Sequence, residues 1–183
     1  MERGYRDSIT KVVIEEGIVH IGNTSFYESS SITEITIPDS VKSIGDYVCY
    51  YNLYLQSLTI PDSVESIGEC AFHACISMKS LTLGSGLTSL GIHAFHGCKS
   101  LTDVEIPSGI TVIPDYLFCE SRSLTNLTLP DGLTHIGKEA FLRCNVRTLV
   151  IPETVEHIDE RAFYMSFSIQ EILFKGTDFI TRA

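Results

Sequence analysis

A repeat of about 23 residues constrains the fold of this 183-residue chain more than any other feature of its sequence. The clearest copy runs from Leu55 to Cys75, and the segments Met78–Cys98 and Leu124–Cys144 repeat its apolar positions. A single unit of this length cannot bury its own apolar face, so the copies must stack into a solenoid. The shared register predicts repeats that open at Ile9, Ile32, Leu55, Met78, Leu101, Leu124, Val146 and Ile169.

The array predicts a single domain over residues 9–183, made of seven repeats and a partial eighth. The unit that opens at Leu124 is one residue shorter than the others, and the deletion falls beside Asn145 in a connecting segment, where a change of length is tolerated. Residues 1–8 precede the array and are interpreted as a boundary or tag segment.

Each repeat opens with an alternation of apolar and polar residues that is typical of a half-buried strand. In the copy that opens at Leu55, Pro61 ends this strand because proline cannot donate to a ladder. An Ala-Phe-x-x-Cys segment then predicts one or two helical turns. Stacking of such units predicts an α/β repeat fold, a curved solenoid with a parallel concave sheet and short helical or irregular convex segments. One buried ladder of this sheet is expected to contain Leu58, Leu81, Val104 and Leu127.

Charge and hydropathy argue against several classes of partner. The chain carries a net charge of -10 and has no basic run, which argues against nucleic-acid binding and against anionic membrane surfaces. No apolar stretch approaches the roughly 20 residues of a membrane span, so we expect no membrane insertion. The first residues, Met1–Arg6, lack the apolar core of a signal peptide and leave the compartment open.

The pattern L-T-x-L-x-I-P-x-x-V-x-x-I-G-x-x-A-F-x-x-C, seen most fully in Leu55–Cys75, resembles the BspA-like leucine-rich repeat family. The resemblance covers residues 9 to about 176. It implies a curved solenoid used in adhesion or protein recognition, a secreted or cell-surface location, and neither catalytic residues nor a cofactor. Several residues depart from this pattern, and the departures predict a looser core in the outer repeats. The departing residues are Cys49, Pro114, Asp159, Ser29, Asn52, Ser121 and Ser166.

The repeat therefore predicts a non-enzymatic scaffold that presents a surface to a protein or glycan ligand. No phosphate-binding loop, nucleophile elbow or metalloprotease helix occurs in the sequence. Threonine and serine also suit an exposed parallel sheet that binds nothing. The exposed positions in the middle of the concave face also lack the Trp, Tyr and Arg that dominate interfaces. A structural spacer is therefore the second hypothesis. The candidate binding residues on the concave face are Glu34, Thr36, Ser57, Thr59, Ser80, Thr82, Asp103, Glu105, Asn126 and Thr128.

A metal-binding scaffold is the third hypothesis. Cys70 and His73 lie three residues apart, and the repeat places them opposite His93 and His96. These residue types are zinc ligands, although the spacing matches no standard ligand motif. The alternative is that four variable surface positions acquired these residues independently.

The cysteines and the ends of the array give two further expectations. Cys75 and Cys98 fall on adjacent repeats, but parallel side chains are poorly oriented for a disulfide, so we expect buried free thiols. The end repeats lack an evident cap, so their open strand edges predict that the ends are either the most mobile part of the chain or are covered by self-association.

Overall fold

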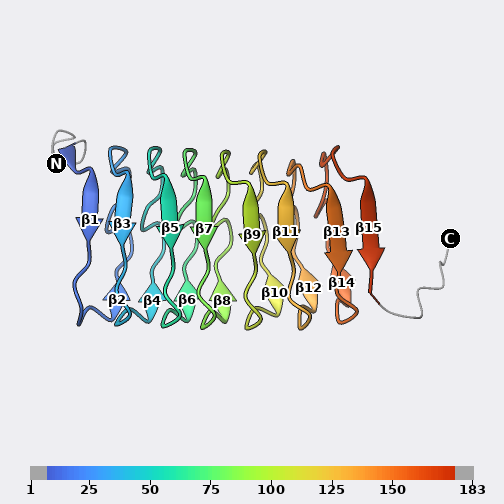
Figure 1. The fold of residues 1–183 in the computed structure, drawn as a ribbon, viewed down its shortest axis with the longest axis horizontal. Helices are drawn as coiled ribbons and strands as arrows, with labels where there is room; N and C mark the ends of the chain where they lie inside the picture. Colours follow the sequence, from blue (N-terminus) through green and yellow to red (C-terminus); the bar gives the residue numbers. More distant parts are fainter. Residues whose placement is uncertain (1–7, 176–183) are drawn as a thin grey trace.

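The computed structural model describes residues 8–175, which form a row of stacked rungs that follow one another in sequence order (Figure 1). Each of the first seven rungs contributes one long and one short strand, the last described rung contributes a long strand, and every paired strand runs parallel to its partner. The long strands are β1 (Lys11–Val13), β3 (Glu34–Thr36), β5 (Ser57–Thr59), β7 (Ser80–Thr82), β9 (Asp103–Glu105), β11 (Asn126–Thr128), β13 (Thr148–Ile151) and β15 (Glu171–Phe174). The short strands are β2 (His20–Ile21), β4 (Ser43–Ile44), β6 (Ser66–Ile67), β8 (Ser89–Leu90), β10 (Val112–Ile113), β12 (His135–Ile136) and β14 (His157–Ile158).

The long strands confirm the register predicted from the repeat. Ser57 pairs with Ser80 and Asn126 pairs with Asp103, as the sequence alignment of the units requires. The four residues predicted to form a buried ladder, Leu58, Leu81, Val104 and Leu127, are all buried. Polar residues of the same strands are exposed, so each strand buries one face and presents the other. We call this exposed side of β1, β3, β5, β7, β9, β11, β13 and β15 the long-strand face.

The hydrogen-bonded sheets are shorter than a single continuous sheet. The long strands pair as β1–β3, β5–β7, β9–β11 and β13–β15, and the short strands form one sheet of β2, β4, β6 and β8 and another of β10, β12 and β14. A strand of three residues has few backbone N–H and C=O groups with which to pair with a neighbour on each side. The strand pairs β1–β3 and β5–β7 are nevertheless joined just before β3 and β5 begin, where the Gln56 N–H donates to the Thr33 carbonyl at 3.2 Å.

Pro114 explains why the short-strand sheet divides between β8 and β10. At the equivalent position, the N–H of Gly68 donates to the Ile44 carbonyl, and the N–H of Gly91 donates to the Ile67 carbonyl, both at 2.8 Å. Proline has no N–H to donate, so the bond that would join the rung of Pro114 to that of Leu90 cannot form. Neighbouring rungs also approach closely at this position in the repeat. A Cβ on Gly91 would collide with the backbone of Gly68, so glycine fits there.

The loop after each short strand is not helical anywhere in residues 8–175, which corrects the helical turns predicted for the Ala-Phe-x-x-Cys segments. Its N–H groups donate to the next rung, as from Phe72 to the Ala94 carbonyl at 2.8 Å and from Ala74 to the His96 carbonyl at 2.7 Å. A helix directs its N–H groups along its own axis and could not make these bonds, and so short a segment has little helical stability of its own. No helix in this part of the chain is long and apolar enough to cross a membrane.

A column of phenylalanine side chains forms the middle of the core. Phe72, Phe95, Phe118 and Phe141 are fully buried, and consecutive rings are stacked with interplanar angles of 10° or less. Cys49 occupies the equivalent position one rung before Phe72, so the column is interrupted there and Phe26 is only partly buried. The core is therefore densest in the central rungs.

A second buried column satisfies backbone carbonyls. Cys98 Sγ donates to the Phe72 carbonyl at 3.5 Å, and Ser166 Oγ donates to the Phe141 carbonyl at 3.0 Å. Serine in this column therefore donates to the same kind of backbone carbonyl as cysteine does. Ser121 and Ser166 do not loosen the core as the sequence suggested. Asn52 is the exception, because its side chain is fully buried and both its amide nitrogen and its amide oxygen lack a hydrogen-bond partner.

The six cysteines are free and buried. Burial away from charge raises the pKa of the Cys98 thiol to about 12, so the thiol remains protonated and behaves as a small apolar group. Residues 1–7 of the predicted boundary segment and residues 176–183 lie outside the described part of the chain. Self-association through the ends stays a prediction.

Phe95→Ala should lower the free energy of unfolding by about 3–5 kcal/mol, because it removes a buried ring and leaves a cavity between two rungs. Phe26→Ala should cost less, because that ring is only partly buried. Chemical denaturation of the two variants measures the difference. Equal costs would contradict a core that is densest in the central rungs.

Asn52→Cys should raise the free energy of unfolding by about 1–2 kcal/mol, because it removes two unpaired polar atoms from the core. The thiol has a carbonyl partner at the equivalent positions of neighbouring rungs. The reciprocal change, Cys98→Asn, should destabilise the protein and serves as the control. A lower denaturation midpoint for Asn52→Cys would show that Asn52 has a role in the core that its contacts do not reveal.

Candidate functional site

The structure exposes all ten candidate binding residues on the long-strand face. They form two columns, because the residue that starts each long strand lies beside its counterpart in the next rung, and so does the residue two places later. The first column contains Glu34, Ser57, Ser80, Asp103 and Asn126, and the second contains Thr36, Thr59, Thr82, Glu105 and Thr128.

An open groove of about 1010 Å³ lies over β7, β9 and β11. Its lining includes five of the ten candidates, Thr82, Asp103, Glu105, Asn126 and Thr128. The other five, Glu34, Thr36, Ser57, Thr59 and Ser80, lie outside it. The groove therefore concentrates the candidate site on the central rungs.

Carboxylates dominate the charge of this groove. Asp62, Asp103, Glu105 and Asp131 line it together with a single cationic side chain, Lys175, whose Nζ lies 2.8 Å from Asp131 Oδ1. These side chains are solvent-exposed, so a ligand could reach them. The groove is suited to a ligand that carries positive charge or many hydrogen-bond donors.

Local hydrogen bonds hold two of these carboxylates in their ionised form. The Thr102 hydroxyl and then the Asn126 amide donate to Asp103 and lower the pKa of its carboxyl group. The Ser85 N–H donates to Asp62 Oδ1 at 2.7 Å and lowers the pKa of Asp62. Both groups are therefore anionic at neutral pH.

Sequence reasoning missed the wall of the groove. Pro107, Pro130 and Asp131 belong to the turns after the long strands, and Lys175 reaches Asp131 from a position 44 residues later in the chain. The proline that recurs after the strands was a signal for Pro107 and Pro130, and the aspartate that often follows it was a signal for Asp131. No local pattern signals the approach of Lys175.

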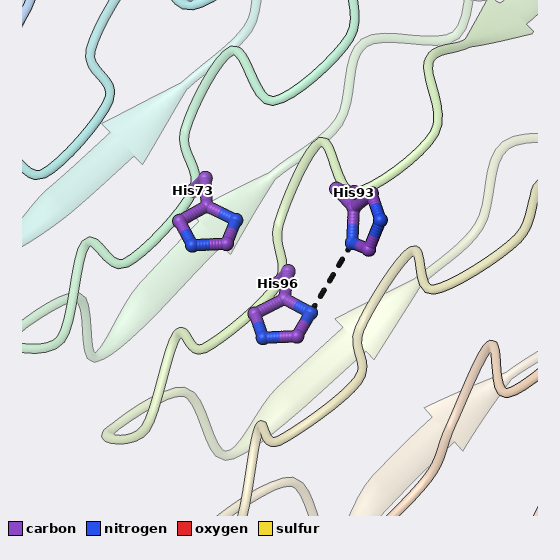
Figure 2. Close-up of side chains that lie close together, drawn as sticks. All are labelled: His73, His93 and His96. Atoms are coloured by element: carbon purple, nitrogen blue, oxygen red, sulfur yellow. Dashed lines mark hydrogen bonds between the residues drawn. The ribbon is translucent and has the colours of Figure 1, made fainter.

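A second candidate site gathers three of the four proposed metal ligands. One ring nitrogen from each of His73, His93 and His96 lies within 4.8 Å of the others. His93 Nδ1 lies 3.3 Å from His96 Nδ1, and Figure 2 shows a nitrogen of His73 on the side of its ring that faces His93. All three rings are half-buried.

Cys70 lies outside this group, which corrects the predicted ligand set. Its thiol is not among the ligand atoms that lie within 4.8 Å of one another. Cys70 adopts a positive φ of 51° and is buried, and burial raises the pKa of its thiol. The shared column with His93 was visible in the sequence, but the direction of the two side chains was not.

Aromatic rings that the sequence analysis did not consider surround the histidines. His73 stacks on His96 with ring centroids 4.6 Å apart and on Tyr50 at 4.8 Å, and Tyr50 stacks on Tyr27 at 5.1 Å. His93 stacks on Tyr116 at 4.5 Å. The spacing of 23 residues between Tyr27, Tyr50, His73 and His96 was the available signal.

Burial keeps the three imidazoles neutral. Desolvation, followed by the nearby charges of His96 and His93, lowers the pKa of His73 to about 4. Desolvation is also the largest cause of the lowered pKa values of His93 and His96. At neutral pH each ring therefore offers an unprotonated nitrogen.

The sequence model of the BspA type leucine-rich repeat region matches six copies in this chain, over residues 4–52 and 46–170. The chain belongs to the BspA-type leucine-rich repeat family. The match covers the histidine cluster and every residue of the groove except Lys175, so both candidate sites lie on the repeat array.

Solved structures of leucine-rich repeat proteins have the same fold. A leucine-rich cell surface protein of Faecalibacterium prausnitzii A2-165 is 29% identical with a TM-score of 0.85, over 91% of this chain and 48% of that one. A leucine-rich repeat protein of Eubacterium ventriosum is 25% identical with a TM-score of 0.81, over 96% of this chain and 46% of that one. The chain thus spans about half the length of these two relatives. No curated protein matches its sequence.

Acid should destabilise this BspA-type array through His73. The pKa of His73 is about 4 in the folded protein and ordinarily 6.5. Below pH 6.5 the imidazole of the unfolded chain is therefore protonated while that of the folded chain remains neutral. The stabilisation is therefore complete above pH 6.5 and is lost as the pH falls toward 4. Because the ring is partly exposed and screened, we expect a loss of roughly 1–2 kcal/mol.

Denaturation midpoints of the wild type and of His73→Tyr, measured between pH 7 and pH 4, isolate this contribution from that of the carboxylates. Tyrosine is the residue at the equivalent position of the preceding rung, where Tyr50 stacks in the same column. The variant should show the shallower loss of stability. Parallel curves for the two proteins would mean that His73 titrates normally.

Proposed function

We propose that this chain is a non-enzymatic recognition scaffold that binds a protein segment or a glycan in the groove over β7, β9 and β11. The observation that supports the proposal is the coincidence of this groove with five candidate residues in two regular columns. Hydroxyl, amide and carboxylate groups recur there along the solenoid axis, so an extended ligand would meet similar hydrogen-bonding groups at each rung.

The charge of the groove favours a basic ligand among these. Four carboxylates and one ammonium group line it, so an extended peptide with lysine or arginine side chains would gain favourable electrostatic interactions. Exposed carboxylates also accept hydrogen bonds from sugar hydroxyl groups, which keeps a glycan among the candidate ligands.

The proposal extends to location. We infer a cell-surface or secreted location, supported by similarity to the leucine-rich cell surface protein of Faecalibacterium prausnitzii. Adhesion would then be one use of the groove. A structural spacer is the alternative function, and it requires no ligand at the long-strand face.

Arrays of extended basic peptides and of glycans, probed with the full chain, test the proposal. We expect saturable binding that Thr128→Arg weakens at least tenfold, or by about 1.4 kcal/mol, because the new side chain blocks the groove and opposes a basic ligand. Thr36→Arg is the matched control, because Thr36 is exposed in the same column on β3 but lies outside the groove.

Two results would contradict the proposal. If the two arginine variants weakened ligand binding equally, the binding site would not lie in the groove. An absence of saturable binding to both arrays, with the protein folded, would favour the spacer function.

A further inference from the structure

We propose that His73, His93 and His96 bind one divalent transition-metal ion of the class of zinc, nickel or copper. The residues belong to the loops after β6 and β8. They share no residue with the groove on the long-strand face, so the inference is independent of the proposed function.

The separation of two of the ligand atoms already suits a metal ion. His93 Nδ1 and His96 Nδ1 lie 3.3 Å apart. Two imidazole nitrogens at about 2.0–2.1 Å from a tetrahedral zinc ion lie about 3.3–3.4 Å from each other. The metal would replace the hydrogen bond between the two rings, and each ring would carry its proton on Nε2.

His73 supplies the third nitrogen. Its Nδ1 is shielded from solvent and has no hydrogen-bond partner, which is an uncompensated cost for a buried polar atom. The nitrogen that His73 offers is within 4.8 Å of those of the other two histidines, so a movement of this half-buried ring on binding would bring all three nitrogens to one ion. Coordination through Nδ1 would give this atom the partner that the protein alone does not provide.

The backbone beneath the cluster is held in place by the neighbouring rungs. The His93 N–H donates to the Asp115 carbonyl at 3.2 Å, and the Ala74 N–H donates to the His96 carbonyl at 2.7 Å. The fully buried rings of Phe72 and Phe95 lie next to His73 and His96 in the chain and stack on each other. The ligands are therefore carried by a rigid part of the fold, which lowers the entropic cost of binding.

Electrostatics around the cluster favour a cation. The rings are neutral at pH 7, so protons do not compete with a metal there. Glu69 and Asp115 act on His93, and Glu120 acts on His96 against the opposing charge of Lys99. Three carboxylates against one ammonium group leave a net negative field.

Packing alone does not require histidine at these positions. The same two columns hold Tyr27 and Tyr50 before His73, and Tyr116 after His93, and the tyrosine rings stack equally well. Histidine replaces tyrosine where the three side chains converge. Three histidines leave a coordination position open for water or for a group from a bound partner.

Isothermal titration with Zn²⁺ at pH 7.5, with Ni²⁺ and Cu²⁺ in parallel, tests the site on the full chain without a polyhistidine tag and after treatment with a chelator. We expect one equivalent per chain, and Co²⁺ should give visible d–d absorption bands. His73→Tyr and His93→Tyr should each weaken binding at least tenfold, and both copy residues of their own columns. His20→Asn is the matched control, because His20 lies outside the cluster, and it should bind as the wild type does.

Zn²⁺ should also protect the three histidines of the wild-type protein from diethyl pyrocarbonate, as mapped by mass spectrometry. This second measurement decides the question if a tyrosine variant fails to fold. The proposal is overturned if the wild type binds none of the metals, if both tyrosine variants keep the wild-type affinity, or if Zn²⁺ leaves the modification of all three histidines unchanged.

Discussion

The structure depends on hydrogen bonds that each rung makes in register with the next. The Ile60 N–H donates to the Thr82 carbonyl at 2.9 Å beside the long strands, and the loops make the corresponding bonds from Phe72 to Ala94. Because these partners occupy equivalent positions in consecutive repeats, any change of period would break several bonds at once. The one deletion is absorbed beside Asn145, whose side chain donates to the Arg122 carbonyl at 2.6 Å, and Phe141 N–H still reaches the Ala162 carbonyl.

Register turns each repeat position into a column, and this determines how the core is built. Phenylalanine stacks on phenylalanine, and thiol or hydroxyl groups donate to the carbonyls of the rung before. It also shows which substitutions matter. Pro114 removes one ladder bond, and Asn52 introduces polar atoms that the column cannot satisfy. The energetic consequences of a mutation therefore follow from its column as much as from its own contacts.

The same columns organise the surface. Corresponding residues of the central long strands have the same exposure, so a regular scaffold acquires local chemistry only through the identity of the residues in each column. Asp103 and Glu105 make the central groove acidic, while His73 and His96 place two imidazoles in a column that holds tyrosine in earlier rungs. A BspA-type array can thus carry two separate candidate sites on different segments of its rungs without altering the fold.

The sequence by itself determined the period, the stacking of the repeats, the strand register and the ladder of Leu58, Leu81, Val104 and Leu127. All of these follow from apolar periodicity, because one side chain position in every rung must be buried. Only the tertiary structure decided the conformation of the loops, where hydrogen bonds between rungs hold an irregular backbone in place of the helical turns that the sequence suggested. It also decided that Lys175 meets Asp131 and that Cys70 lies apart from His73, His93 and His96, because side-chain direction depends on backbone angles and packing that spacing in the sequence does not encode.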